Sequence, residues 1–295
     1  MRTVTIGNFD GVHLGHMKVL EEAMSCGGPV TAVCFEPVTR QYFNPGRWSR
    51  RLTTSWERFS ILKDRGVDRV QLVPFHSGTA TQGPGEFLEE LLDGTDTGRV
   101  VVGYDFHFGI RRTGTVELLE RWCTSRGIGT IIVPPLEIGH EPVKSERIRL
   151  LLDRGETVQA NGLLGRPYSL TGVVARGKGL GRELGFPTLN LRVACCKLLP
   201  VSGSYCGYVY STDVGERMAA AVFVPGTEGG PVEAYVPGRR LDEVYGSLMR
   251  MEIVERIRER AFPGSMDELR ELIAGDVDAV MEFDQLKGRM EDPVE

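Results

Sequence analysis

A glycine-rich turn after a short apolar segment constrains the fold of this chain more than any other feature. The apolar residues 4–6 precede the ten residues G-N-F-D-G-V-H-L-G-H, and apolar residues at helical spacing follow them. This order predicts a buried strand, a tight turn and a helix, with His16 near the start of that helix. Because the first N–H groups of a helix are unpaired and its dipole is positive there, the turn favours an anion such as a triphosphate.

Length and composition predict two globular domains with separate cores. The chain has 295 residues, of which 41% are hydrophobic and 25% are charged. This length is large for a single compact domain. The formal net charge of −5 argues against a general nucleic-acid coat, because binding of that kind needs a basic surface.

The cysteines and the apolar segments indicate a cytoplasmic protein. None of the six cysteines forms a C-x-x-C pair, so reduced thiols are expected. No apolar segment at the N-terminus has the length of an export signal. No later segment approaches the roughly 18 apolar residues of a membrane-spanning helix. We expect neither a membrane nor a nucleic-acid partner, and the oligomeric state is left open.

The first domain, residues 1–160, has the pattern of a Rossmann-like α/β fold. Short apolar runs alternate with helical patterns, which predicts a parallel sheet covered by helices. The expected strands are 4–6, 30–35, 70–73, 100–102 and 130–133. A helix should follow the capping-box pattern Thr54-Ser55-Trp56-Glu57, and others should span 86–92 and 116–126. The first turn lacks the G-x-G-x-x-G pattern of dinucleotide-binding folds.

The second domain, residues 161–295, changes to short β segments separated by glycines. The expected strands are 169–175, 203–210, 218–224, 232–236 and 248–254, which favours closure into a small barrel. Another capping-box pattern, Ser265-Met266-Asp267-Glu268, predicts a final helix. The boundary between the domains is expected near residues 158–166.

A second glycine-rich segment, G-K-G-L-G-R-E-L-G-F-P-T-L-N over residues 177–190, marks a second candidate site. Its glycines let a backbone approach phosphates closely, and Lys178 and Arg182 add positive charge. Glycine-rich hairpins are common in β domains, so the ending G-F-P-T-x-N is the more specific part of the segment.

These motifs resemble those of the bacterial bifunctional riboflavin kinase/FAD synthetase family. The decapeptide is similar to the signature of its adenylyltransferase module, and G-F-P-T-x-N is similar to its flavokinase motif. Further similar segments lie at residues 52–54, 66–70, 102–109 and 143–149. The resemblance implies an α/β nucleotidyltransferase domain followed by a flavokinase β-barrel with a C-terminal helix.

For the first domain the resemblance implies adenylylation of FMN by ATP, which yields FAD and pyrophosphate. His13 and His16 would be catalytic and would donate hydrogen bonds to phosphate oxygens. Asn8 and Asp10 would orient the turn or a bound magnesium ion. The implied ATP-binding residues are Gly7, Asn8, Phe9, Asp10, Gly15, Ser145 and Arg149. The implied flavin-binding residues are Asp105, Phe106 and Phe108, although Asp105 also fits a simple turn residue.

For the second domain the resemblance implies phosphorylation of riboflavin by ATP, with Mg²⁺ as the metal cofactor. Thr188 and Asn190 would hold the metal, and Glu233 would accept the proton of the riboflavin hydroxyl. A glutamate on an exposed strand is usually only solvated, so this role rests on the order of the motifs. The implied ATP-binding residues are Gly177, Lys178, Gly179, Gly185 and Pro187. Phe186 would contact the flavin.

Three segments differ from the family's pattern. The second strand continues as F-E-P-V-T, with Val38 and Thr39 where the family has F-x-P-H-P. Lys144 and Glu146 stand where Ser and Thr are common, and residues 223–230 replace an N-I-G-x-R-P-T segment. Three alternatives therefore stay open: only one of the two activities is retained, the substrate of nucleotidyl transfer is another small molecule, or the chain is a non-enzymatic flavin-binding regulator. Riboflavin, FMN, FAD and ATP are the expected small-molecule partners.

Overall fold

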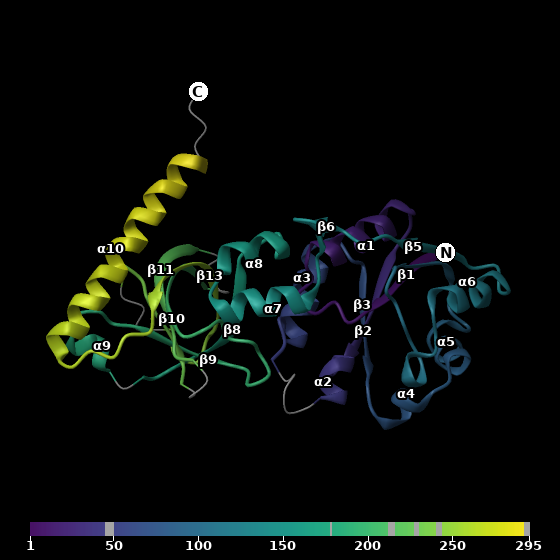
Figure 1. Ribbon diagram of the computed structural model, residues 1–295, viewed down its shortest axis with the longest axis horizontal. Coiled ribbons are helices and arrows are strands. Elements are labelled where there is room, and N and C mark those ends of the chain that lie inside the picture. The colour runs from purple at the N-terminus through teal and green to yellow at the C-terminus, as the bar shows by residue number, and fades with distance from the viewer. Residues whose placement is uncertain (45–49, 178, 212–215, 227–229, 240–243, 292–295) are drawn as a thin grey trace. The chain divides into compact units, whose positions relative to one another are not determined.

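The chain folds into two compact units, Met1–Ser145 and Glu146–Glu295. The computed structural model describes residues 1–44, 50–177, 179–211, 216–226, 230–239 and 244–291. The first unit is an α/β fold, and the second is a closed β-barrel followed by a long helix (Figure 1). The predicted fold classes and their order are confirmed.

The segment expected to hold the domain boundary is helical. Helices α7 (Ser145–Arg154) and α8 (Thr157–Leu164) precede the barrel, and α8 packs on its strands β8 (Tyr168–Ala175) and β13 (Leu248–Glu259). The Asn161 side chain donates to the carbonyl of Ile253 at 3.0 Å and accepts from the N–H of Tyr168 at 2.7 Å. These contacts join α8 to the barrel, in the unit that begins at Glu146. The domain limits drawn from the sequence, 1–160 and 161–295, stay a prediction.

The α/β unit contains a five-stranded parallel sheet with the order β3-β2-β1-β4-β5. Its strands are β1 (Arg2–Gly7), β2 (Val30–Glu36), β3 (Arg69–Pro74), β4 (Thr97–Gly103) and β5 (Gly129–Val133), so all five predicted strands form. Its helices are α1 (Leu14–Ser25), α2 (Thr39–Phe43), α3 (Ser55–Asp64), α4 (Ser77–Thr81), α5 (Pro84–Leu92) and α6 (Val116–Thr124). The short helices α2 and α4 and the hairpin β6 (Glu137–Ile138) and β7 (Glu141–Pro142) lack a sequence signal strong enough to predict them.

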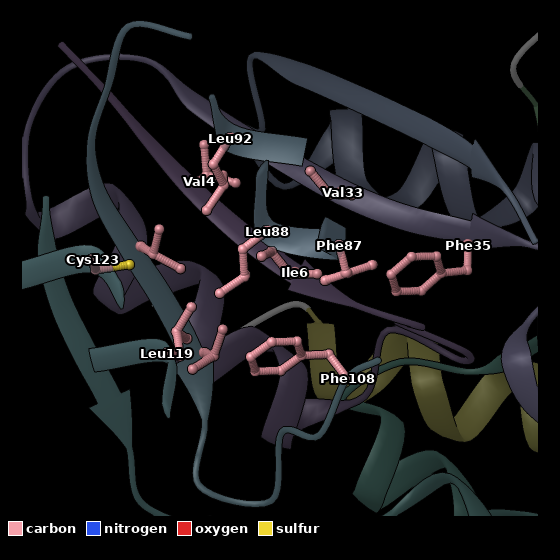
Figure 2. Packing of buried hydrophobic residues seen from close by; sticks show 12 residues of the cluster. Val4, Ile6, Val33, Phe35, Phe87, Leu88, Leu92, Phe108, Leu119 and Cys123 are labelled. Atoms are coloured by element: carbon pink, nitrogen blue, oxygen red, sulfur yellow. The ribbon is translucent and has the colours of Figure 1, made fainter. Parts of the chain in front are cut away.

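The alternation of side chains along the strands builds a core on each face of this sheet. Val33 and Phe35 of β2 join one cluster, which α5 and α6 cover with Phe87, Leu88, Leu119 and others (Figure 2). Ala32 and Cys34 of the same strand join a cluster on the opposite face with residues of α1 and α3. Burial in that cluster raises the pKa of the Cys34 thiol to about 11, which keeps it protonated at neutral pH.

A buried network of charges lies beside the ends of β1 and β2. The Arg51 guanidinium donates to both carboxylate oxygens of Glu36, at 2.6 and 2.9 Å. The Arg58 guanidinium, which is completely buried, donates to Glu36 at 2.9 Å and to the carbonyls of Asn8 and Phe35 at 2.7 and 3.0 Å. Burial alone would raise the pKa of Glu36, but the hydrogen bonds from Arg51 and Ser55 outweigh it and lower the pKa.

The second unit contains a closed barrel with the strand order β10-β11-β12-β9-β8-β13. The strands not yet given are β9 (Leu189–Val193), β10 (Gly203–Ser211), β11 (Arg217–Val224) and β12 (Val232–Tyr235). The five predicted strands all form, and β9 is an additional strand within and after the G-F-P-T-x-N motif. Strand β13 continues to Glu259, because its outer part pairs with the start of β10 rather than ending in a turn.

The final helix α10 (Met266–Glu291) is fastened to the barrel by a polar cluster. Asp276, which is 6% exposed, accepts two hydrogen bonds from the Arg258 guanidinium at 2.8 and 2.7 Å and one from the Ser204 hydroxyl at 2.7 Å. Of the predicted capping box, Ser265 accepts the N–H of Glu268 at 3.2 Å, whereas the Glu268 carboxylate accepts from the N–H of Gly264.

We predict that Asp276→Asn destabilises the barrel unit by about 2 to 3 kcal/mol, because it leaves a half-buried arginine with a neutral partner. Urea unfolding followed by far-ultraviolet circular dichroism measures the change. The matched control is Asp278→Asn, which removes an exposed carboxylate from the same helix. An equal loss of stability in both variants would show that the charge on the helix matters and the buried cluster does not.

We predict that Glu36→Gln costs the α/β unit on the order of 2 kcal/mol at pH 7. Because the folded-state pKa of Glu36 is lowered from 4.5, its contribution is complete above that pH and disappears as the pH falls through the folded-state value. The difference between the two proteins should therefore shrink in acid. Trp56 and Trp122 lie in the described part of this unit, so tryptophan fluorescence reports its unfolding. A difference that is constant from pH 7 to pH 3 would contradict the assignment.

Candidate active sites

The turn between β1 and α1 holds its backbone in a strained shape. Phe9, Gly11 and Val12 all have positive φ angles, of 47°, 88° and 40°. Such angles cost energy for residues with a Cβ, so surrounding contacts must hold them. Phe9 and Val12 provide part of that support, because their side chains are buried in the core between the sheet, α1 and α3. Any contact of Phe9 with a nucleotide would therefore use its backbone.

Hydrogen bonds from distant segments hold the middle of this turn. The Asp10 carboxylate accepts from the N–H and the hydroxyl of Thr53, at 3.0 and 3.3 Å, and the N–H of Gly11 donates to that hydroxyl at 3.0 Å. The Ser145 hydroxyl donates to the carbonyl of Asp10 at 2.8 Å. The structure thus brings together Asp10 and Ser145, which the sequence places 135 residues apart. Asp10 is 4% exposed and orients the turn.

The two histidines of the turn stack on each other at the start of α1. His13 is the N-cap residue, and its Nδ1 accepts the N–H of His16 at 3.3 Å. Their ring centroids lie 3.6 Å apart, and Phe9 contacts His16 at 5.2 Å between centroids. Because Nδ1 of His13 accepts a hydrogen bond, the neutral ring carries its proton on Nε2 and can donate it to an oxygen.

Glycine at position 15 allows this helix start to lie close to a second segment. A Cβ at Gly15 would lie 3.0 Å from the carbonyl of Val143 and 3.2 Å from the His13 ring. Gly7, at the end of β1, is also closely packed, because a Cβ there would lie 3.1 Å from the Phe9 ring. Both predicted ATP-binding glycines thus permit close packing around the turn.

The predicted flavin loop after β4 has one exposed and one buried part. Asp105 forms an ion pair with Lys144 at 3.2 Å, and both side chains are about half exposed. Hydrogen bonding to Tyr104, and the pairing with Asp105, raise the pKa of Lys144. Phe108 is 5% exposed within the core, while the half-buried Phe106 stacks on it at 5.3 Å. Phe106 is thus the better placed of the two to contact a ligand.

Arg149, the remaining predicted ATP ligand of the first site, lies on α7 in the second compact unit. It is 9% exposed, and its guanidinium contacts the Glu146 carboxylate at 3.3 Å. The family difference at position 146 thus has a structural consequence, because a carboxylate now neutralises this arginine within the helix.

In the barrel, the three residues predicted for metal and proton transfer converge. Glu233 of β12 and Asn190 of β9 are directly paired across the strands, so their side chains share one face of the sheet. The Thr188 hydroxyl donates to the Glu233 carboxylate at 3.2 Å, and the Asn190 amide donates to the Thr188 carbonyl at 3.3 Å. The arrangement places a hydroxyl, an amide oxygen and a carboxylate at one point.

The glycine-rich segment packs closely against these residues. A Cβ at Gly177 would lie 2.5 Å from the Asn190 side chain, and a Cβ at Gly181 would lie 2.4 Å from the carbonyl of Phe186. Gly179 and Gly185 instead have positive φ angles of 83° and 89°. The Phe186 ring meets Tyr235 edge-on at 5.4 Å. Lys178 lies outside the described residues, as do 227–229 of the altered segment 223–230.

A cavity of about 420 Å³ opens beside this segment. Its lining residues include the predicted Gly177, Gly179, Pro187, Thr188 and Asn190, and also Arg182. Sequence reasoning assigned no role to three further lining residues, namely Arg176, Arg239 and Tyr245. Arg176 lies 5.7 Å from the centroid of the Tyr245 ring, and Arg239 pairs with Glu216 at 2.5 Å. Only the position of Arg176, next to the glycine run, gave a signal in the sequence.

Two kinds of feature were sought among the described residues, a membrane-spanning helix and a cluster of metal-ligating side chains. No helix there is long and apolar enough to cross a membrane. No group of three or more His, Cys, Asp and Glu side chains there could hold a metal ion.

Comparison with known proteins matches both units. The FAD synthetase family model matches residues 1–147, and the riboflavin kinase family model matches residues 164–283. The chain is 31% identical over 286 residues to the bifunctional riboflavin kinase/FMN adenylyltransferase of Pseudomonas fluorescens, covering 93% of this chain and 90% of that protein. The protein of that name from Escherichia coli K12 is 31% identical over 290 residues, covering 95% and 92%.

A solved structure is similar along almost the whole chain. It is described as a macrolide-efflux protein from Streptococcus pneumoniae, and it matches with a TM-score of 0.83 and 27% identity over 95% of this chain and 93% of that one. Two family models cover the two units in the predicted order, and relatives at 31% identity align with nearly the full length. The chain therefore belongs to the bifunctional riboflavin kinase/FMN adenylyltransferase family.

Proposed function

We propose that this chain makes FAD from riboflavin in two steps, each of which consumes one ATP. The barrel phosphorylates riboflavin to FMN, and the α/β unit joins FMN to AMP with release of pyrophosphate. The convergence of Thr188, Asn190 and Glu233 beside a glycine-lined cavity supports the first step most directly. The stacked histidines at the start of α1 support the second.

In the kinase step Glu233 is the general base. Its carboxylate accepts a hydrogen bond from the Thr188 hydroxyl at 3.2 Å, which holds it beside the candidate metal ligands. The riboflavin 5′-hydroxyl gives its proton to this carboxylate as its oxygen attacks the γ-phosphorus of ATP. The bond from that phosphorus to the bridging oxygen breaks, and ADP leaves. Arg176, Arg182 and Arg239 line the cavity and supply positive charge for the phosphates.

We propose Mg²⁺ as the ion that accompanies ATP in this step. The donor set fits it, because Mg²⁺ prefers oxygen ligands and usually takes only one or two from the protein and others from phosphate and water. The Asn190 amide nitrogen is occupied by the Thr188 carbonyl, which directs the amide oxygen toward a cation. When bound, the ion would neutralise charge on the transferring phosphoryl group, and Thr188 and Asn190 would hold it.

In the adenylyl-transfer step the protein aligns two phosphates and stabilises charge. The FMN phosphate oxygen attacks the α-phosphorus of ATP, and the bond to the pyrophosphate oxygen breaks. His13 Nε2 and His16 donate hydrogen bonds to the oxygens on which negative charge increases, and the N-terminal N–H groups of α1 add to that field. No covalent intermediate with the protein is required, so catalysis rests on alignment.

Other residues complete the proposed ligand sites. Phe106 and Asp105 contact the flavin in the α/β unit, Phe186 contacts it in the barrel, and Ser145 and Arg149 bind phosphates. We also propose that the enzyme works in the cytoplasm, where its six free cysteines would stay reduced. Retention of one activity, and flavin binding without turnover, are the alternatives that the following experiment distinguishes.

The test is incubation of the purified protein with riboflavin, ATP and Mg²⁺, followed by chromatographic separation of flavins. We expect FMN to appear first and FAD to follow. FMN alone, or FAD only when FMN is supplied, would establish a single activity. If neither product forms while flavin binds, the chain is a flavin-binding protein and the proposal is wrong.

We predict that His16→Ala lowers the rate of FAD formation from FMN about 100-fold, because it removes a donor to the transition state. Formation of FMN from riboflavin should stay within about twofold of the wild-type rate, which corresponds to a change of about 0.4 kcal/mol in the activation free energy. His140→Ala, which removes an exposed histidine from the same unit, is the control. An unchanged rate of FAD formation in the His16 variant would remove this residue from the mechanism.

We predict the opposite pattern for Glu233→Gln. Loss of the base should lower FMN formation from riboflavin by about 100-fold or more, while FAD formation from supplied FMN continues. The control, Glu255→Gln, changes an exposed glutamate on another strand of the barrel. A Glu233 variant with full kinase activity would mean that another group accepts the proton.

A further inference from the structure

Asn8, at the exit of β1, is held by three hydrogen bonds from outside the turn. Its carbonyl accepts from the buried Arg58 guanidinium at 2.7 Å. Its side-chain amide nitrogen donates to the Thr39 hydroxyl at 2.9 Å, and its side-chain oxygen accepts the backbone N–H of Thr39 at 3.0 Å. Both polar groups of the Asn8 side chain are thus engaged by a residue 31 positions later in the chain.

Thr39 is suited to this contact because of its place at the start of α2. The N-cap position belongs to Val38, whose side chain is 4% exposed and makes no cap hydrogen bond. The side-chain oxygen of Asn8, a residue from another segment, therefore caps the helix by accepting the N–H of Thr39. The reciprocal pair requires a residue with both an N–H and a β-hydroxyl, which limits the choice to threonine or serine.

The residues that follow Asn8 need such an anchor. Phe9 has a positive φ angle directly after it, and the Phe9 ring contacts the His16 ring. A strained backbone keeps its shape only where several contacts determine it together. Arg58 fixes the direction of the Asn8 backbone carbonyl, and Thr39 fixes the Asn8 side chain. A displacement of Asn8 would move Phe9, and the Phe9 ring contacts the stacked histidines.

We propose that Thr39 is a positioning residue for adenylyl transfer, which acts through Asn8 to keep His13 and His16 aligned with the reacting phosphates. This inference rests on the proposed function of the α/β unit. The side chain and the N–H of Thr39 form hydrogen bonds with Asn8, so it acts on the placement of the histidines through that residue. Loss of its hydroxyl should lower the rate of the chemical step more than the affinity for ATP.

The test compares Thr39→Val, Thr39→Ser and wild-type enzyme in FAD formation from supplied FMN. Valine keeps the shape and the N–H but lacks the hydroxyl, and we expect a fall in kcat of about 10-fold with KM for ATP within about twofold. Serine restores the hydroxyl and should keep kcat within about twofold of the wild type. The control is Thr79→Val, which removes a hydroxyl that donates to the carbonyl of Pro74. FMN formation by the barrel serves as an internal standard.

Several outcomes would overturn the inference: wild-type kcat in Thr39→Val, an equal loss in Thr39→Ser, an equal loss in Thr79→Val, or a rise in KM without a fall in kcat. Tryptophan fluorescence checks that the α/β unit is folded at the assay temperature. If valine unfolds it, Thr39→Ala replaces valine in the same comparison with serine. Absence of FAD formation by the wild-type enzyme would instead refute the proposed function itself.

Discussion

The α/β unit depends on a carboxylate, that of Glu36, which two buried guanidinium groups share. Burying a charged arginine costs several kcal/mol unless it is paired, and Glu36 offsets part of that cost by accepting hydrogen bonds from both Arg51 and Arg58. Arg58 then has further donors, which it directs at the carbonyls that end β1 and β2. The Arg58 guanidinium therefore both pairs with Glu36 and helps to place the first active-site turn.

Much of the fold could be predicted because its signals are local. The capping box at Thr54 and Glu57 forms as expected, since both of its hydrogen bonds lie within four residues. The strands were visible as apolar runs between turns. Helix α2 was not, because its first N–H, that of Thr39, is accepted by the Asn8 side chain rather than by a cap side chain beside it in the sequence. A cap supplied from a distant segment leaves no pattern at the helix itself.

In the candidate sites, too, residues with a local sequence signal could be predicted, and residues that act through distant contacts could not. Motif order was enough to select Thr188, Asn190 and Glu233, and the register of β9 and β12 brings them together. The lining arginines Arg176 and Arg239 were missed, because many exposed arginines look alike until the fold shows which of them face a cavity. The roles of Arg58 and Thr39 were missed for a related reason. Their importance comes from contacts with Asn8, and nothing in the sequence indicates those contacts.

The glycine-rich segment of the barrel is constrained in two different ways. Gly177 and Gly181 are glycines because another atom occupies the space of a Cβ, whereas Gly179 and Gly185 are glycines because of their backbone angles. Asparagine tolerates such angles better than other residues, so it is an evolutionary alternative at the second pair and not at the first. Related chains that diverge in this segment should therefore change at Gly179 before they change at Gly177, where the backbone lies against the Asn190 side chain.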